Sequence, residues 1–293
     1  MKRCSILLTV MLILCIMSCA DNPDAETQPH VNGNDQVSQP ESVSREDDAF
    51  ISADPEIGQD YSVDLGDNVF LEMVWIPGGT FLMGSPENEE GRQEDEGPQT
   101  EVTLDGFWMG KYEVTQEQFE AITGDTPSSS EDYNHPVETV SWFDAMGFCD
   151  ELSYLTGDEY TLPTEAQWEY ACRAGSTDIY YYGDDPEELG SYSWYVDNSD
   201  GGHHTVGSRS PNEYGLYDMH GNVNEWCLSL YGEYENYDDS DGRNSLDDAT
   251  SARVLRGGSW GSLPELCRSA DRGKWNPEYR FTSYGGFRCV MNP

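Results

Sequence analysis

The sequence predicts an α+β fold with much irregular structure, preceded by an export signal and a polar linker. Three observations lead to this prediction. A short apolar run follows two basic residues, Lys2 and Arg3, at the N-terminus. The next segment is nearly free of aromatic side chains, whereas all 8 Trp lie beyond it. In that later part, strand and helix patterns give way after Gly175 to a region rich in Gly, Asn, Asp and aromatic residues.

The apolar run Ile6–Met17 is too short to cross a bilayer as a helix, which needs roughly 20 residues. A basic head, a short apolar run and a small residue before a cleavage point are typical of a secretory signal, here residues 1–18. The sequence Ile16-Met17-Ser18-Cys19 resembles the bacterial lipobox, which implies that Cys19 carries a lipid and becomes the first mature residue. The alternative is an ordinary signal peptide with an incidental cysteine. Ala20-Asp21 does not match the usual inner-membrane retention signal, which favours an exported protein anchored in the outer membrane of the cell envelope.

Residues 19–62 are expected to form a disordered acidic stalk. The segment from Asp21 to about Tyr61 is rich in Asp, Glu, Gln, Ser, Pro and Asn and contains a single aromatic residue, Phe50, before Tyr61. Such a chain buries too little apolar surface to offset the entropy of ordering it. From Val63 onward aromatic residues become frequent, so residues 63–293 are predicted to form one domain.

The formal net charge of −41, with only three Lys, excludes some classes of partner. Binding to nucleic acid or to an anionic membrane surface through a basic patch is not expected, so the membrane would be contacted only through the lipid on Cys19. The acidity can serve solubility, or it can attract cationic or Arg-bearing peptides. The sequence alone favours the first explanation.

The first part of the domain reads as short strands. Phe70–Ile76 alternates and is rich in β-forming residues, and the Pro77-Gly78-Gly79 turn leads into Thr80–Met83, which predicts a hairpin. Val102–Leu104 and Phe107–Met109 are expected to be further strands.

Three helices are predicted from their N-terminal capping patterns. Thr115 and Thr164 are each followed three residues later by Gln, which is a capping pattern. Ser141 precedes a segment in which apolar residues fall on one helical face. After Gly175 no convincing helix follows, and turns with short strands are expected.

The stretch Tyr214–Trp226 is the most suggestive chemically. Asp218 and Glu225 bracket a Gly-Asn turn, which could aim two carboxylates and the intervening carbonyl groups at one point. Hard oxygen ligands of this mixed type suit Ca²⁺. The alternative is that Asp218 caps a turn and Glu225 is a solvated charge, and the motif alone favours this alternative.

Cysteine usage in the domain is typical of an exported protein. Scattered cysteines in such domains usually pair as disulfides. Zinc binding is not favoured because no two cysteines have C-x-x-C spacing. Because the domain has five cysteines, at least one thiol stays unpaired. The five cysteines are Cys149, Cys172, Cys227, Cys267 and Cys289.

Several blocks occur in the order found in one known family: Met73–Gly84, Tyr112–Gln116, His135–Trp142, Leu162–Tyr170, Tyr214–Trp226, Arg256–Trp260 and Gly286–Cys289. Together they resemble the formylglycine-generating enzyme family, also called the sulfatase-modifying factor family, over residues 63–293. The resemblance implies an irregular fold related to C-type lectins, with little regular secondary structure.

The resemblance also implies a structural calcium ion. Its ligands would be the side chains of Asp218 and Glu225 and the carbonyl groups of Gly221 and Val223. A second family calcium site would begin at Asn198 and Ser199. The loop that follows is shorter here, and Asp200 is a poor substitute for the remaining acidic ligand.

Two disulfides follow from the same resemblance. One matches a family pair, Cys149–Cys289. Cys172 matches half of another pair, whose second position is Ser269 here. Cys267 lies two residues earlier, on the same side of an extended segment, so the expected pair is Cys172–Cys267. This leaves Cys227 as a buried thiol.

One departure from the family bears on activity. The family enzyme uses O₂ and two copper(I)-binding cysteines to oxidise a cysteine in a Cys-x-Pro-x-Arg segment of a sulfatase, and thiolates are the soft ligands that select Cu(I). The corresponding segment here, Ser259–Cys267, is shorter and has no cysteine before Cys267. Ser262 and Pro264 stand near the expected cysteine positions, so copper is not expected.

The histidines offer no further site. Adjacent side chains in an extended segment face opposite ways, so a shared metal site at His203 and His204 is not expected. His220 is interpreted as structural. His135 precedes a proline, and no Gly-x-Ser-x-Gly motif is present, so no nucleophilic triad is indicated.

Two functions are compatible with these features. The favoured one is a non-catalytic binding or scaffold module with a protein or glycan partner at the cell surface. Trp194, Trp260 and Trp275 are candidate contact residues, although core packing is the alternative, above all for Trp260. The second function is an oxidase that converts a sulfatase cysteine to formylglycine at an altered site.

Overall fold

The computed structural model of the protein describes residues 56–234, 244–246 and 248–293. The predicted signal peptide, Cys19 and the predicted stalk up to residue 55 lie outside this part. The described residues form an α+β unit with three α-helices and three small sheets, which confirms the predicted fold class. No helix in this part is long and apolar enough to cross a membrane.

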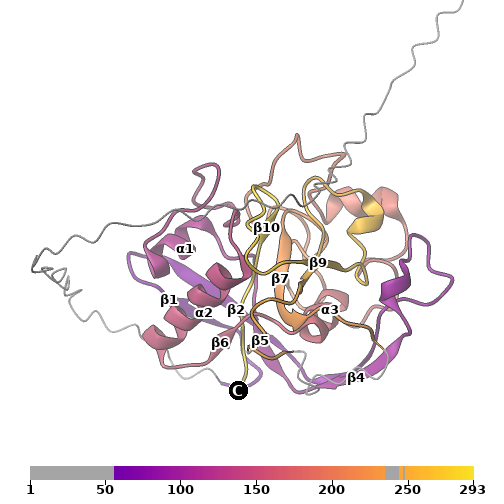
Figure 1. Cartoon of the computed structure of the whole chain (residues 1–293), viewed down its shortest axis with the longest axis horizontal. Helices are drawn as coiled ribbons and strands as arrows, with labels where there is room; N and C mark the ends of the chain where they lie inside the picture. The colour runs from indigo at the N-terminus through magenta and orange to yellow at the C-terminus, as the bar shows by residue number, and fades with distance from the viewer. Residues whose placement is uncertain (1–55, 235–243, 247) are drawn as a thin grey trace, which may run out of the picture. The chain divides into compact units, whose positions relative to one another are not determined.

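The largest sheet has five strands in the order β1-β2-β5-β11-β6, and all neighbours are antiparallel. Strand β11 lies between β5 and β6, although it comes from the end of the sequence (Figure 1). Strand β1 spans the predicted boundary between stalk and domain at residues 62 and 63. The bounds are β1 Tyr61–Asp64, β2 Phe70–Ile76, β5 Phe107–Gly110, β6 Tyr160–Thr161 and β11 Val290–Met291.

The predicted hairpin between residues 70–76 and 80–83 is wrong, although both segments are strands. Strand β3, Gly79–Met83, pairs with β4, Thr100–Leu104, and not with β2. Gly78 lies directly against the backbone of the turn between β4 and β5, where a Cβ would clash. The Tyr170 hydroxyl donates to the Pro77 carbonyl at 2.9 Å. These contacts turn the chain out of the large sheet before β3 begins.

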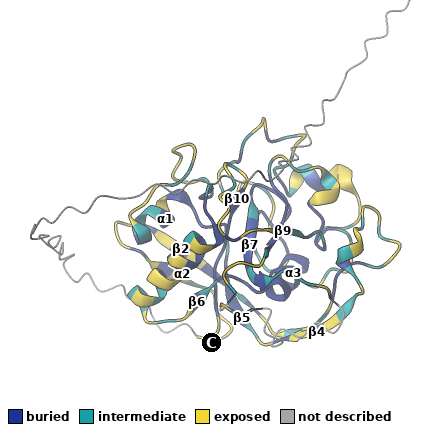
Figure 2. Cartoon of the chain, viewed as in Figure 1, coloured by how far each residue is buried: buried dark blue, intermediate teal, exposed yellow. Residues whose placement is uncertain are grey.

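The three predicted helices form at their predicted caps. They are α1 Gln116–Thr123, α2 Trp142–Thr156 and α3 Glu165–Arg173, and each begins with a complete capping box. Helix α1 packs on α2, which contacts β6. Helix α3 contacts β3 and two later strands, β7 (Asn224–Leu230) and β8 (Arg253–Arg256). Both α1 and α2 expose one face to solvent, whereas every residue of α3 is buried (Figure 2).

A four-stranded sheet, in the order β10-β7-β8-β9, builds the second half of the domain. Strand β7 begins directly after the loop that carries Asp218, and β10 runs parallel to it. After Gly175 the described residues contain short strands and 3-10 turns but no α-helix, as the sequence predicts. The bounds are β7 Asn224–Leu230, β8 Arg253–Arg256, β9 Gly273–Trp275 and β10 Gly285–Gly286.

Candidate functional site

The loop from Asp218 to Glu225 has an unusual backbone that short polar residues and glycine make possible. Asp218 and Asn222 have φ angles of 59° and 65°, a left-handed region that Asp and Asn tolerate better than most residues. The Asn222 amide donates to the Trp194 carbonyl at 2.9 Å. A Cβ on Gly221 would lie 2.3 Å from that carbonyl oxygen, so only glycine fits there.

Asp218 has a carboxyl group that is only half satisfied. Its Oδ2 accepts a hydrogen bond from the Gly207 amide at 2.7 Å, whereas the buried Oδ1 has no partner. Burial raises the pKa of Asp218 to about 6. A buried acceptor without a donor costs about 1–3 kcal/mol, so this oxygen is suited to a ligand.

Glu225, at the start of β7, is fully paired. The Arg288 guanidinium donates to both of its carboxylate oxygens at 2.7 Å, and the Trp168 indole donates to Oε2 at 2.7 Å. Arg288 is buried and also bonds the carbonyl groups of Gly110 and Tyr217. The carboxylate therefore joins β7 to the segment after β10.

A third carboxyl group, Glu113, lies in the same space, and the sequence reasoning missed it. It accepts hydrogen bonds from the Asn222 side chain at 2.6 Å and from the Val223 amide at 3.0 Å. Burial, with the negative charges of Asp218 and Glu225, raises the pKa of Glu113. In the sequence, only the position of Glu113 within the block Tyr112–Gln116 could have indicated its role.

The chemistry of this cluster suits a divalent cation. Arg288 donates only to Glu225 of the three acids, and Glu113, Asp218, Glu225 and Arg288 are all at most 1% exposed. Mutual repulsion opposes full ionisation of the three acids, because the charges of Asp218 and Glu225 raise the pKa of Glu113, and hard oxygen donors of this kind favour Ca²⁺. Within the described residues, however, no three His, Cys, Asp or Glu side chains are arranged to hold a metal ion as they stand. The unpartnered Oδ1 of Asp218 is the available donor, and calcium stays a prediction.

The residues of the predicted second calcium site already have partners. The Asn198 side chain accepts from the Tyr195 amide at 2.9 Å and donates to the Ser193 carbonyl at 2.9 Å. The Ser199 carbonyl lies 2.8 Å from Nε2 of His204. These contacts describe a turn that is stabilised by its own side chains.

All five cysteines of the domain are buried free thiols in the structure, so the two disulfides stay predictions. Cys149 and Cys289 are near enough for the charge of Cys289 to influence the Cys149 pKa. The sulfur atom of Cys172 lies 3.7 Å from the Met219 carbonyl oxygen and 3.9 Å from Nδ1 of His220. Burial raises the pKa of every one of these thiols.

The segment that aligns with the copper-binding region is tightly folded. The Ser262 hydroxyl accepts from the Ser259 amide at 2.9 Å, and Pro264 starts a 3-10 turn that ends at Leu266. Cys267 is buried, and a Cβ on Gly258 would lie 2.9 Å from its sulfur atom. This thiol therefore faces the protein interior.

His135 lies beside both His203 and His204, with ring centroids 5.0 and 6.5 Å away. Its Nδ1 lies 2.9 Å from Nδ1 of His203, whose Nε2 is 3.8 Å from the buried Glu138. His204 instead stacks on Trp194 with ring centroids 3.7 Å apart. The contact of His135 with both rings was not foreseen, because it depends on two loops that meet only in the folded chain.

Two of the three tryptophans named as contact residues are only half-buried, and the third is exposed. Trp194 lies between His204 and the guanidinium of Arg209, which is 3.6 Å from its ring centroid. Trp260 stacks on Tyr284 with centroids 4.4 Å apart. Trp275, on β9, is 47% exposed.

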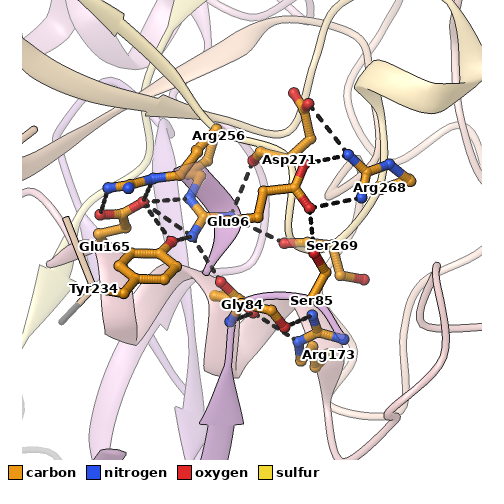
Figure 3. Close-up of polar contacts among 12 residues, drawn as sticks. Gly84, Ser85, Glu96, Glu165, Arg173, Tyr234, Arg256, Arg268, Ser269 and Asp271 are labelled. Carbon is orange, nitrogen blue, oxygen red and sulfur yellow. Dashed lines mark hydrogen bonds and ion pairs between the residues drawn. The ribbon is translucent and has the colours of Figure 1, made fainter. Parts of the chain in front are cut away.

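A network of buried ion pairs joins α3 to β8 and to the segment after it (Figure 3). Arg256 donates to Glu169 at 2.7 Å and Arg272 to Glu165 at 2.6 Å. In the same region Arg268 donates to Glu96. Each of these carboxylates is paired with an arginine, so we interpret the network as structural. In the sequence, the spacing of Glu165 and Glu169, one turn apart on α3, is the one feature that could have indicated this network.

Comparison with known proteins supports the pattern of blocks. Residues 67–293 match the sulfatase-modifying factor enzyme 1-like domain. The formylglycine-generating enzyme of Mus musculus is 30% identical over 291 residues, which cover 75% of this chain and 75% of that protein. Chaperone protein LppX of Paenibacillus barcinonensis is 29% identical over 255 residues, which cover 70% of this chain and 84% of that protein.

Another relative is much longer than the matched region. Serine/threonine-protein kinase pkn1 of Chlamydia pneumoniae is 34% identical over 254 residues, which cover 76% of this chain but 38% of that protein. Among solved structures, PvdO from Pseudomonas aeruginosa is 30% identical with a TM-score of 0.72, covering 82% of this chain and 100% of that one. Treponema denticola variable protein 1 is 28% identical with a TM-score of 0.69, covering 80% and 99%.

Proposed function

Because the chain belongs to the sulfatase-modifying factor enzyme 1-like domain family, we propose that it acts as a non-catalytic binding or scaffold module. A lipid on Cys19 would hold it in the cell envelope, and its partner would be a protein or a glycan at the cell surface. The observation that carries this proposal is the segment Ser259–Cys267, which has no cysteine before its last residue.

The side chains of this segment are poor copper(I) ligands. Serine offers a hard, protonated oxygen and proline offers no side-chain donor, whereas Cu(I) selects thiolates. The hydroxyl of Ser262 is already used within the turn. Cys267 is buried, and burial raises its pKa, which disfavours the thiolate form. A two-thiolate site is therefore not expected here.

The calcium loop would serve as a support for a binding face. The backbone of Asn222 joins two of the three candidate contact residues, because its amide donates to the Trp194 carbonyl and its carbonyl accepts from the Trp260 amide at 2.8 Å. A divalent cation among Glu113, Asp218 and Glu225 would balance the buried charge and stiffen this loop. Calcium would therefore stabilise the face without taking part in chemistry.

The names of the relatives are compatible with a function other than oxidation. One relative that the chain matches over most of its length, LppX, is called a chaperone protein. The formylglycine-generating enzymes match over a similar share of this chain, so an oxidase remains the second candidate. Function depends on the site and not on the fold, and the site favours the binding module.

Mass spectrometry of a Cys-x-Pro-x-Arg peptide, incubated with the protein, copper(I) and air, separates the two functions. We expect no aldehyde product, while a formylglycine-generating enzyme run in parallel converts the same peptide. Aldehyde formed by this protein would overturn the non-catalytic function. In that case Cys267→Ser should abolish the conversion if Cys267 is the reactive thiol.

A further inference from the structure

Three of the 5 histidines of the chain gather where two loops meet. His135 belongs to the loop between α1 and α2, whereas His203 and His204 belong to a loop in the second half of the domain. The Val206 amide donates to the Asn134 carbonyl at 3.0 Å, so the two loops are also joined through the backbone. The side chain of His203 is 4% exposed, and that of His135 is 19% exposed. Solvent therefore reaches this group of side chains through His135.

The hydrogen bonds of His135 and His203 determine which ring nitrogens carry a proton. Nε2 of His135 lies 3.2 Å from a carboxylate oxygen of Asp132, which can only accept, so this nitrogen is assigned a proton. A neutral His135 then offers Nδ1 as an acceptor. The proton in the 2.9 Å contact between the two Nδ1 atoms consequently belongs to His203. The contact thus requires an unprotonated Nδ1 on His135.

A buried carboxylate, that of Glu138, lies on the far side of His203. Its Oε1 is 3.8 Å from Nε2 of His203. The same carboxylate accepts hydrogen bonds from the Ser129 hydroxyl at 2.7 Å and from the Ser283 amide at 2.6 Å. Although burial acts in the opposite direction, hydrogen bonds from His203 and Ser129 lower the pKa of Glu138 to about 2. Its negative charge therefore persists in acid, and it attracts a first additional proton to Nε2 of His203.

A further proton conflicts with the geometry of the histidine pair. The remaining site is Nδ1 of His135, which faces the N–H group of His203 at 2.9 Å. A proton there would set two N–H groups against each other and bring two imidazolium charges together. Burial lowers the pKa of His135, and the charges of His203 and His204 act in the same direction, while Asp132 opposes them. Helix α1 contributes the neutral Gln116, whose backbone amide donates to the His135 carbonyl at 3.0 Å.

We propose that the contact between His135 and His203 is an acid-sensitive latch, which joins the two loops near neutral pH and releases them when His135 takes up a second proton. A histidine that folding makes harder to protonate stabilises the folded state above its ordinary pKa of 6.5, and this stabilisation is lost as the pH falls. Release would reach the proposed binding face, because His204 stacks on Trp194. The latch goes beyond the proposed function and would act whether the domain binds its partner or oxidises it.

Hydrogen exchange of the purified full chain, followed by mass spectrometry, tests the latch. Wild type and His135→Gln are compared at the same pH, so that the pH dependence of the exchange chemistry cancels. At about pH 5, residues 199–207 should exchange roughly tenfold faster in the wild type, the factor that corresponds to one pKa unit, because Gln gains no charge. At about pH 8, where histidine is neutral, this difference should disappear. His30→Gln, a matched control outside the described residues, should follow the wild type at both pH values.

Exchange in the five-stranded sheet separates release of the loops from general acid unfolding. Strands β2 and β5 should stay protected in the wild type at both pH values. If they lose protection in acid together with residues 199–207, the latch is overturned. Equal exchange of residues 199–207 in the wild type and His135→Gln at the lower pH would overturn it as well.

NMR titration of the histidine rings provides a second measurement that does not depend on the fold of a variant. With 5 histidines in the chain, each ring signal can be assigned by single substitution. The signals of His135 and His203 should respond to one shared acid transition, at a lower pH than a histidine in a short peptide. A His135 signal that titrates as in the peptide, without a response from His203, would contradict the latch.

Discussion

Replacing Asp218 with Asn should stabilise the protein when divalent cations are removed. The carboxyl group is buried, and Oδ2 accepts from the Gly207 amide while Oδ1 has no partner. Asn keeps an oxygen for the first contact and replaces the unpartnered, ionisable oxygen with a neutral amide group, which removes the cost of a buried charge. The left-handed backbone at this position, with φ of 59°, also tolerates Asn.

The size of the effect follows from the pKa of Asp218, which burial raises to about 6 from 3.8. A carboxyl group whose pKa is raised on folding stabilises the folded state below its unfolded pKa, and this stabilisation is lost as the pH rises through the folded value. The difference corresponds to about 3 kcal/mol at neutral pH. At about 2–4 °C per kcal/mol for a domain of this size, that amounts to about 6–12 °C in Tm.

Thermal melts in a calcium chelator and in excess calcium, at about pH 5 and about pH 7.5, measure this effect. In chelator at the higher pH, Asp218→Asn should melt above the wild type, and the gap should shrink at the lower pH. In calcium the wild type should gain more than the variant, because the variant has lost a charged ligand. Asp105→Asn, at an exposed turn, is the matched control.

Two results would refute this reasoning. A variant that melts below the wild type in chelator would mean that the ionised carboxylate is already satisfied. A wild-type protein whose Tm does not respond to calcium would mean that the cluster does not hold that ion.

Three other predictions concern different parts of the chain. Glu165→Gln leaves the buried Arg272 guanidinium without its carboxylate, while Arg256 keeps Glu169, and should lower the free energy of unfolding by about 3–5 kcal/mol in urea. Glu72→Gln, in a half-exposed pair, should cost less than about 1 kcal/mol, and similar losses for both variants would contradict the role of burial. Burial raises the pKa of Asp271 to about 7, so stability from this group is present at low pH and lost as the pH rises through 7; Asp271→Asn should flatten the pH profile of Tm, and an unchanged profile would argue against it. Cys19→Ser should move the protein from the membrane fraction to the soluble fraction, and unchanged fractionation would exclude a lipid anchor at this residue.

The sequence predicted the structures that depend on neighbouring residues, such as helix caps. It did not predict which distant segments pair as strands. The caps at Thr115, Ser141 and Thr164 depend on side chains three residues away, so the helix starts were predicted correctly. The hairpin failed because β3 finds its partner in β4, and the contacts that redirect it come from Tyr170 in α3. A turn pattern reports a change of direction and does not identify the neighbouring strand.

The same contrast between local and long-range contacts applies to the candidate site. Asp218 and Glu225 stand in one short motif, and the sequence pointed to both. Glu113 reaches them from more than a hundred residues away, through hydrogen bonds to Asn222 and Val223. Arg288 comes from the other end of the domain. Neither could be placed by spacing, because only the folded sheets bring these segments together.

The position of β11 has a consequence for how the domain is made. Val290 and Met291 form the strand between β5 and β6, so the five-stranded sheet lacks an inner strand until these residues are available. A ribosome delivers β1, β2, β5 and β6 long before it delivers β11. The sheet can therefore close only after nearly the whole domain has been synthesised, and a chain that stops before residue 290 would leave the inner edges of β5 and β6 unpaired.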